Sequence, residues 1–234
     1  IGGLPEVDPA DAIREVKRLT GRMVAINLEP AAISEDIEKD PVWSLTEGRR
    51  ATVENAKKAA DMGVDMIILT GNPGIGVSNH AIVHALNELK AAVGDRVILT
   101  AGKMHAAGVI SEGGENILTE NDVDAFIDAG ADILLLPAPG TVPGITMEYA
   151  HKLIARAHSK GALAMTTIGT SQEGADEATI REIALMCKMA GADIHHIGDS
   201  GYMGMAIPDN ITAYSIAIRG KRHTYRRMAM SLLR

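Results

Sequence analysis

The feature that most constrains the fold of this chain is a recurring unit in which a helix-like segment ends at a glycine and a short apolar run follows. Each glycine stands where a left-handed residue would end a helix, and each apolar run has the length of a β-strand. The unit therefore predicts six helix–strand pairs. The glycines are Gly21, Gly63, Gly94, Gly130, Gly161 and Gly191, and the runs are Met23–Leu28, Met66–Thr70, Val97–Thr100, Ile133–Leu136, Leu163–Thr167 and Ile194–Ile197.

Between the apolar runs, hydrophobic residues recur at helical spacing. Thr119, with Asp122 three residues later, resembles a capping box that opens a helix. Near-continuous apolar strands alternating with one-faced helices indicate a parallel sheet covered by helices, either a closed barrel or an open doubly wound sheet. The helical positions include Val53, Ala56 and Ala60; Val123, Phe126 and Ile127; Met147, Ala150, Leu153 and Ile154; and Ile180, Ile183, Ala184 and Cys187.

Three observations favour the barrel. The units repeat about every 31 residues, one eighth of a typical barrel of about 250 residues. No dinucleotide fingerprint follows a strand. Related tetrapeptides, Met62–Asp65, Ala129–Asp132 and Ala190–Asp193, precede every second strand, so alternate strands share an environment, as layered barrel packing requires. We therefore expect an α/β protein with the (β/α)8 fold, the TIM barrel, with residues 1–234 forming one domain.

A complete barrel has eight strands, and the sequence shows six. The chain after Gly198 reads as a loop and a helix without a further apolar run. We therefore expect Met23–Leu28 to be the third barrel strand and Ile194–Ile197 the eighth. On this interpretation the first two βα units precede Ile1 or are missing, and Ile1–Pro5 is a remnant of the loop after the second strand.

Charge and composition exclude some classes of partner. A net charge of −7 argues against a general nucleic-acid surface, which needs clustered lysine and arginine. No stretch of about 18 apolar residues is present to span a membrane, and Cys187, the only cysteine, has no partner for an internal disulfide. We therefore expect a cytoplasmic protein without nucleic-acid or membrane partners. Because barrels commonly associate, we also expect a homo-oligomer.

In a TIM barrel the active site is built at the carboxyl ends of the strands. Asn27 and Glu29 share one face at the end of the first visible strand, and Asn27 is a candidate substrate-binding residue. Glu29 is a candidate general base or metal ligand, or else a carboxylate that anchors its loop. Thr70 and Asn72, also candidate binding residues, belong to a glycine-rich turn whose N–H groups either cradle an anion or form only a tight turn.

Lys103 and His105 follow the third visible strand and are candidate catalytic residues. The Lys103 amine is suited to forming a Schiff base or to neutralising a phosphate group. The His105 imidazole is suited to proton transfer near neutral pH, although a histidine in a loop often serves only as a hydrogen-bonding group.

The last two strands end in small turns rich in backbone N–H groups. Loops after the seventh and eighth strands of such barrels form a phosphate site, because exposed amides and a helix dipole favour an anion. Asp199 would repel a phosphate unless it faces away or binds a cation, so we treat it as a candidate catalytic residue. Of His195 and His196, only one can point into the barrel. The candidate phosphate-binding residues are Gly169, Thr170, Ser171, Gly198, Ser200 and Gly201.

A divalent metal held by Glu29, Asp199 and a histidine is an alternative use of this region. No His-x-His or His-Glu-x-x-His spacing encodes such a site. We therefore predict no cofactor and keep a divalent metal as the alternative.

Along its whole length the chain resembles a bacterial family of TIM-barrel proteins that carry turns like Thr70–Gly74, Pro137–Gly144 and His195–Asp199. Members of that family are often labelled haloacid-dehalogenase-like hydrolases and are associated with bacterial sugar-uptake systems. Haloacid-dehalogenase chemistry uses an Asp-x-Asp pair after the first strand of an open sheet, and no such pair follows a predicted strand here. The resemblance therefore implies a fold and brings no catalytic mechanism with it.

The leading hypothesis is an enzyme of aldolase, lyase or isomerase type that acts on a phosphorylated sugar or keto acid. Its candidate acid–base or Schiff-base groups are Glu29, Lys103, His105 and Asp199. One alternative is a sensor that binds a phosphorylated metabolite without turnover, since a fold does not define a function. Another is metal-assisted hydrolysis of a phosphate ester or a lactone.

Overall fold

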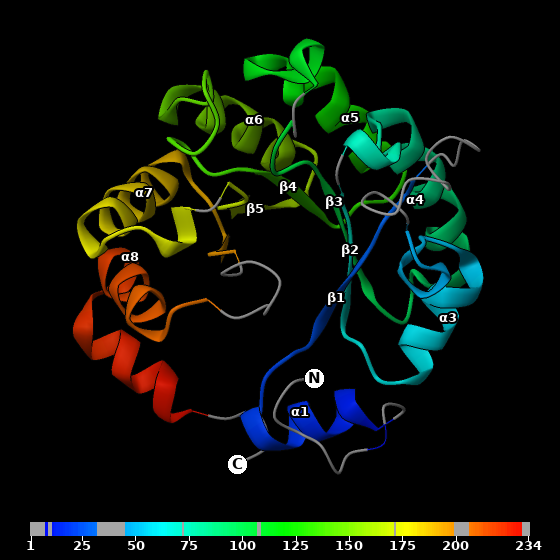
Figure 1. Ribbon diagram of the computed structural model, residues 1–234, viewed down its shortest axis with the longest axis horizontal. Coiled ribbons are helices and arrows are strands. Elements are labelled where there is room, and N and C mark those ends of the chain that lie inside the picture. The colour runs from blue at the N-terminus through cyan, green and yellow to red at the C-terminus, as the bar shows by residue number, and fades with distance from the viewer. Residues whose placement is uncertain are drawn as a thin grey trace.

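The computed structural model of the chain describes residues 8, 11–31, 45–71, 73–106, 109–170, 172–198 and 206–230. In that part of the chain, six strands pair in parallel and in chain order. Figure 1 shows that the sheet curls and that the helices lie along its outer side. The prediction of an α/β fold built like part of a (β/α)8 barrel is confirmed. The strands are β1 (Ala25–Leu28), β2 (Met66–Leu69), β3 (Ile98–Gly102), β4 (Ile133–Pro137), β5 (Leu163–Thr167) and β6 (Ile194–His196).

The helices between the strands begin where the sequence predicts. Hydroxyl groups of Thr52, Ser78 and Thr146 accept hydrogen bonds from the first-turn N–H groups of their helices. Thr119 and Asp122 form the predicted capping box. The α-helices of the described residues are α1 (Ala12–Thr20), α3 (Val53–Asp61), α4 (Asn79–Val93), α5 (Glu120–Asp128), α6 (Met147–Ser159), α7 (Glu177–Ala190) and α8 (Pro208–Ala229).

The predicted left-handed glycine caps are present at most helix ends. Gly21 and Gly191, for example, have φ values of 62° and 101°. The prediction is wrong at Gly94, whose φ of −59° is right-handed. There the N–H groups of Arg96 and Val97 both donate to the carbonyl of Val93, so the chain keeps turning as a helix toward β3 and needs no left-handed residue.

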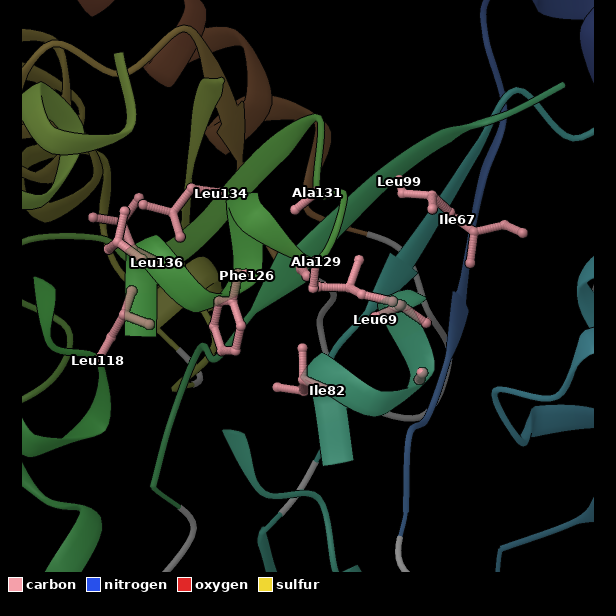
Figure 2. Close-up of a cluster of buried hydrophobic side chains, with 14 of the residues drawn as sticks. Ile67, Leu69, Ile82, Leu99, Leu118, Phe126, Ala129, Ala131, Leu134 and Leu136 are labelled. Atoms are coloured by element: carbon pink, nitrogen blue, oxygen red, sulfur yellow. The ribbon is translucent and has the colours of Figure 1, made fainter. Parts of the chain in front are cut away.

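The two faces of the sheet bury different sets of side chains. One set points outward and packs against the helices, as Figure 2 shows for the strands β2 to β4. Because side chains alternate along a strand, the residues between them point into the curl, which we call the concave face. The outward set includes Ile67, Leu69, Leu99, Leu134 and Leu136, which lie with Ile82 of α4 and Phe126 of α5. The buried residues of the concave face include Ile68, Ile133, Leu135 and Met165.

The three aspartates that precede every second strand make the same contacts at the amino-terminal end of the sheet. Asp65 accepts a hydrogen bond from the N–H of Val24 at 2.8 Å, and its own N–H donates to the Val24 carbonyl at 2.9 Å. Asp132 and Asp193 repeat both bonds with Leu99 and Ala164. Each carboxylate therefore joins the start of its own strand to the start of the preceding strand in the sheet.

Each of these carboxylates also meets a basic side chain from a helix on the outer side. Lys17 of α1 lies 2.8 Å from Asp65, Lys90 of α4 lies 3.0 Å from Asp132, and His158 of α6 lies 2.8 Å from Asp193. One aspartate therefore ties two strands and a covering helix together. We call this arrangement the aspartate clamp, and its regularity explains why the sequence repeats at every second strand.

The carboxyl end of α8 comes close to the residues just after α1, although β1 and β6 form the two ends of the described sheet (Figure 1). The guanidinium of Arg22, just after α1, donates to the carbonyl of Arg227 in α8. α8 changes direction at Gly220, where φ is 77°. Ile1–Pro5 lie outside the described residues, and within the described ones no helix is long and apolar enough to cross a membrane.

We expect Asp65→Asn to lower the free energy of unfolding near pH 7 by about 1 to 2 kcal/mol, because the amide lacks the charge that Lys17 pairs with. Burial acts to raise the pKa of Asp65, but the bonds from Lys17 and Val24 outweigh it and lower that pKa. The stabilisation is therefore present above the unfolded pKa of about 3.9 and is lost as pH falls through the lower folded pKa.

Urea denaturation over this pH range measures the effect, and the gap between variant and wild type should close in acid. The matched control is Asp61→Asn, which changes an exposed carboxylate paired with Arg96 and should cost less than about 0.5 kcal/mol. Equal losses in the two variants would contradict the clamp.

Candidate functional site

Polar side chains form the upper part of the concave face, at the carboxyl ends of the strands. The strand register and the two-residue period place them there, above the apolar residues that fill the lower part. This is the end of a barrel at which active sites are built. Glu29, Thr70, Thr167 and His196 belong to this layer, and Asn27 and Thr100 lie one step below it, level with Ile68 of β2.

Glu29 follows β1 directly, and only 3 % of its surface is exposed. Its carboxylate pairs with the guanidinium of Arg49, whose side chain is mostly exposed. Burial raises the pKa of Glu29, and the charge and hydrogen bond of Arg49 offset only part of that rise. A Cβ built on Gly71 would lie 3.4 Å from a Glu29 carboxylate oxygen, so the turn after β2 passes beside the carboxylate. This geometry suits a general base held at the barrel mouth.

Lys103 follows β3 directly and is 1 % exposed, which places it among the largest completely buried side chains in the described structure. Complete burial is unusual for a lysine. Its neighbour Met104 packs into the apolar cluster of the concave face. A Cβ built on Gly169 would lie 2.7 Å from the Met104 side chain, so the loop after β5 lies against the loop that carries Lys103.

His105 is half-buried, and burial lowers its pKa. Its Nδ1 atom is buried, and no group in the described part of the chain forms a hydrogen bond with it. The imidazole is therefore neutral near physiological pH, with a ring nitrogen left to exchange a proton.

The turn after β5 offers two backbone donors. In the described structure the N–H groups of Gly169 and Thr170 donate to no acceptor. The Thr170 hydroxyl, in contrast, donates to the Thr141 carbonyl at 3.0 Å and contacts Gln172, so it joins this turn to the loop after β4. Neighbouring free N–H groups form the kind of turn that binds anions.

The two adjacent histidines of β6 point to opposite sides. His195 faces the helices, where its Nδ1 lies 3.0 Å from the Tyr214 hydroxyl and the two rings meet edge to face. His196 lies on the concave face beside Thr167 of β5, and its Nδ1 accepts from the Gly198 N–H at 3.0 Å. A neutral His196 ring therefore carries its proton on Nε2.

Several residues predicted from the sequence lie outside the described residues: Asn72, Ser171, Asp199, Ser200 and Gly201. Among the residues that are described, no three histidine, cysteine, aspartate or glutamate side chains lie together as a metal site would need. Asn27 is exposed on the edge strand β1.

Sequence reasoning missed three members of the site region. Arg49 lies twenty positions after Glu29 and carries no local signal that it would pair with that carboxylate. Thr100 and Thr167 stand inside apolar runs, where threonine looks like an ordinary strand residue. Counting alternate positions from Ile98 and Met165 would have placed both hydroxyls on the concave face.

Comparison with known proteins gives a family and a fold. A family model described as a domain of unknown function (DUF7916) matches residues 1–234. No curated protein shows significant similarity to the chain. Neither this family model nor the aldolase and lyase structures that share the fold carry a haloacid-dehalogenase or sugar-uptake name, so that part of the resemblance receives no support from them.

Solved structures share the fold at low identity. A tetrameric deoxyribose phosphate aldolase from Aeropyrum pernix matches with a TM-score of 0.54 at 15 % identity, over 96 % of this chain and 82 % of that one. A putative lyase/mutase from Burkholderia cenocepacia matches with a TM-score of 0.54 at 15 % identity, over 89 % and 70 %. A putative deoxyribose-phosphate aldolase from Coccidioides immitis matches with a TM-score of 0.54 at 10 % identity, over 91 % and 70 %.

We expect Glu29→Gln to be as stable as the wild type, or more stable by on the order of 1 kcal/mol, at pH 8. A carboxyl group whose pKa is raised by folding destabilises the folded state when it is charged. The wild type therefore loses stability as pH rises through that pKa. The advantage of the variant should therefore shrink toward pH 4. Urea denaturation measures it, with the exposed Glu54→Gln as the control, and a large loss at pH 8 would make Glu29 a structural residue.

Proposed function

The chain belongs to the DUF7916 family, and we propose that it is an aldolase- or lyase-type enzyme for a small phosphorylated sugar or keto acid, with the Lys103 amine as its reactive group. The observation that carries the proposal is the complete burial of Lys103 at the carboxyl end of β3. A lysine amine held in a protected site next to proton-transfer groups is the arrangement that forms Schiff bases with carbonyl compounds.

The fold and its neighbours support this choice of chemistry. Two of the solved structures that share the fold are named as aldolases of deoxyribose phosphate, and a third as a lyase/mutase. Those names describe the neighbours, and at 10–15 % identity they lend only the scaffold. The side chains that this chain presents at the barrel mouth carry the rest of the proposal.

The phosphate group is placed by the turn after β5. The N–H groups of Gly169 and Thr170, which donate to no acceptor among the described residues, supply two donors for its oxygens. Because Gly169 packs against Met104, an anion bound there lies near the loop that carries Lys103.

In the proposed reaction the Lys103 nitrogen attacks the carbonyl carbon, and the carbonyl oxygen leaves as water to give an iminium ion. For cleavage, the hydroxyl on the β-carbon gives its proton to a base, the bond between the α- and β-carbons breaks, the β fragment leaves as an aldehyde, and the electron pair of the broken bond turns the iminium into an enamine. For isomerisation or exchange, the base removes the α-proton instead. The enamine is then reprotonated on its α-carbon. Water then releases the product and restores the amine. His105 and Glu29 are the proposed carriers of the protons.

The hydrolase label of the resembling family is not part of the proposal. Hydrolysis of that type needs an Asp-x-Asp pair after a strand, and the sequence has none there. A sensor without turnover remains the alternative, and covalent trapping of the ligand separates it from an enzyme.

We expect borohydride to trap a covalent adduct on Lys103 when the protein is incubated with dihydroxyacetone phosphate, pyruvate or glyceraldehyde 3-phosphate. Mass spectrometry of the digested protein locates the adduct. Lys103→Met should abolish it and should still fold, because a buried polar side chain is replaced by an apolar chain of similar length. Lys57→Met changes an exposed lysine of α3 and should leave trapping intact. Ligand binding without any trapped lysine would favour the sensor.

In heavy water the protein should exchange the protons next to the carbonyl of dihydroxyacetone phosphate for deuterium, and NMR follows this exchange. We expect the exchange to slow as pH falls through the lowered pKa of His105, below about 6.5. The neutral imidazole is the base in that step, and it is lost on protonation. His105→Gln should reduce the exchange rate by about 100-fold or more and flatten this acidic limb. An unchanged limb in the variant would assign the base to another group.

A further inference from the structure

Three threonine hydroxyls of the concave face are buried without a hydrogen-bond partner. Thr70 is 1 % exposed, and Thr100 and Thr167 are 0 % exposed. The Oγ1 atom of each is buried, and no group in the described part of the chain bonds to it. They belong to three strands, since Thr100 lies in β3, Thr167 ends β5 and Thr70 follows β2.

The strand alternation places all three hydroxyls on the inside of the curl. Met165 belongs to the concave cluster and Ala164 to the outer core, so Thr167 points inward. Ile98 packs against the concave cluster and Leu99 belongs to the outer core, so Thr100 points inward as well. Ile68 belongs to the concave cluster and Leu69 to the outer core, so Thr70, two positions after Ile68, points inward too.

A buried hydroxyl without a partner has lost its bonds to water and has gained nothing in exchange. Such groups are few in folded proteins, and each calls for an explanation such as a bound ligand or an ordered water. Three of them on the concave face, which also holds Glu29 and His196, are consistent with a site that a ligand completes.

Their places match the ligand path of the proposed function. Thr167 precedes Gly169 by two positions, so its hydroxyl lies below the proposed phosphate turn. Thr100 lies deeper on the concave face, level with Ile68 of β2 and Ile133 of β4. In the proposed function, a carbon chain that runs from the phosphate turn into the concave face meets hydroxyl groups along its way.

We infer that the inward hydroxyls of Thr70, Thr100 and Thr167 bind the hydroxyl groups of the ligand, so that the substrate is a phosphorylated polyhydroxy carbonyl compound, a sugar phosphate, and not a keto acid. This inference rests on the proposed function and deepens it. A threonine hydroxyl both donates and accepts, which suits the hydroxyl groups of a sugar better than a carboxylate.

The test compares Thr167→Val and Thr100→Val with Thr166→Val. Valine keeps the shape of threonine and removes the hydroxyl. Thr166 is the matched control, because it is also 0 % exposed in β5 and its Oγ1 is likewise buried without a hydrogen-bond partner in the described structure, but it faces outward beside Cys187 and Tyr214. Calorimetry measures the binding of ribose 5-phosphate, of phosphoenolpyruvate, which has no hydroxyl groups, and of inorganic phosphate.

We expect Thr167→Val and Thr100→Val each to weaken ribose 5-phosphate binding by about fivefold to tenfold, and to leave the other two ligands unchanged. Without ligand, both variants should melt at the same or a higher temperature than the wild type, because an unpaired buried hydroxyl has been removed. Thr166→Val should leave all three affinities unchanged.

Two results overturn the inference. One is unchanged ribose 5-phosphate binding in both inward variants, and the other is a wild type that binds phosphoenolpyruvate but not ribose 5-phosphate. A lower melting temperature of the ligand-free inward variants, with unchanged affinity, assigns the hydroxyls to ordered water instead. Borohydride trapping on Lys103 by pyruvate is independent of these hydroxyls, so the proposed function stands or fails separately.

Discussion

The aspartate clamp at the amino-terminal end of the strands is the interaction on which the rest of this structure depends. Asp65, Asp132 and Asp193 each bind the backbone of a neighbouring strand and a basic residue of a covering helix. These bonds hold the strands in register at one end of the sheet. The same register then sets which side chains of the other end face the concave side.

Two kinds of buried polar group stand at opposite ends of the strands. The amino-terminal end carries hydrogen-bonded and ion-paired carboxylates, and the middle of the concave face is filled by apolar side chains. The carboxyl end instead buries Glu29, Lys103 and threonine hydroxyls that have no partner among the described residues, and such groups are costly to bury. Under the proposed function, ligand binding offsets that cost.

The sequence predicted the strands closely, because each is a short apolar run set off by a glycine. It erred at Gly94, since whether a glycine turns left-handed depends on the carbonyls around it and not on its identity. Glu29 and Lys103 were chosen as candidates because a polar residue directly after an apolar strand is conspicuous, and the structure buries both side chains. Thr100, Thr167 and Arg49 were not, because their roles arise only from strand register and from a loop that returns to β1.

The clamp also bears on how the chain folds. The residues that each clamp joins are 41, 33 and 29 positions apart, so each clamped strand pair closes a loop of modest length with the helix that connects it. Contacts between residues near in sequence favour fast folding. The sheet is therefore expected to assemble as a series of two-strand modules that dock side by side, each completed by its own carboxylate before the next is added.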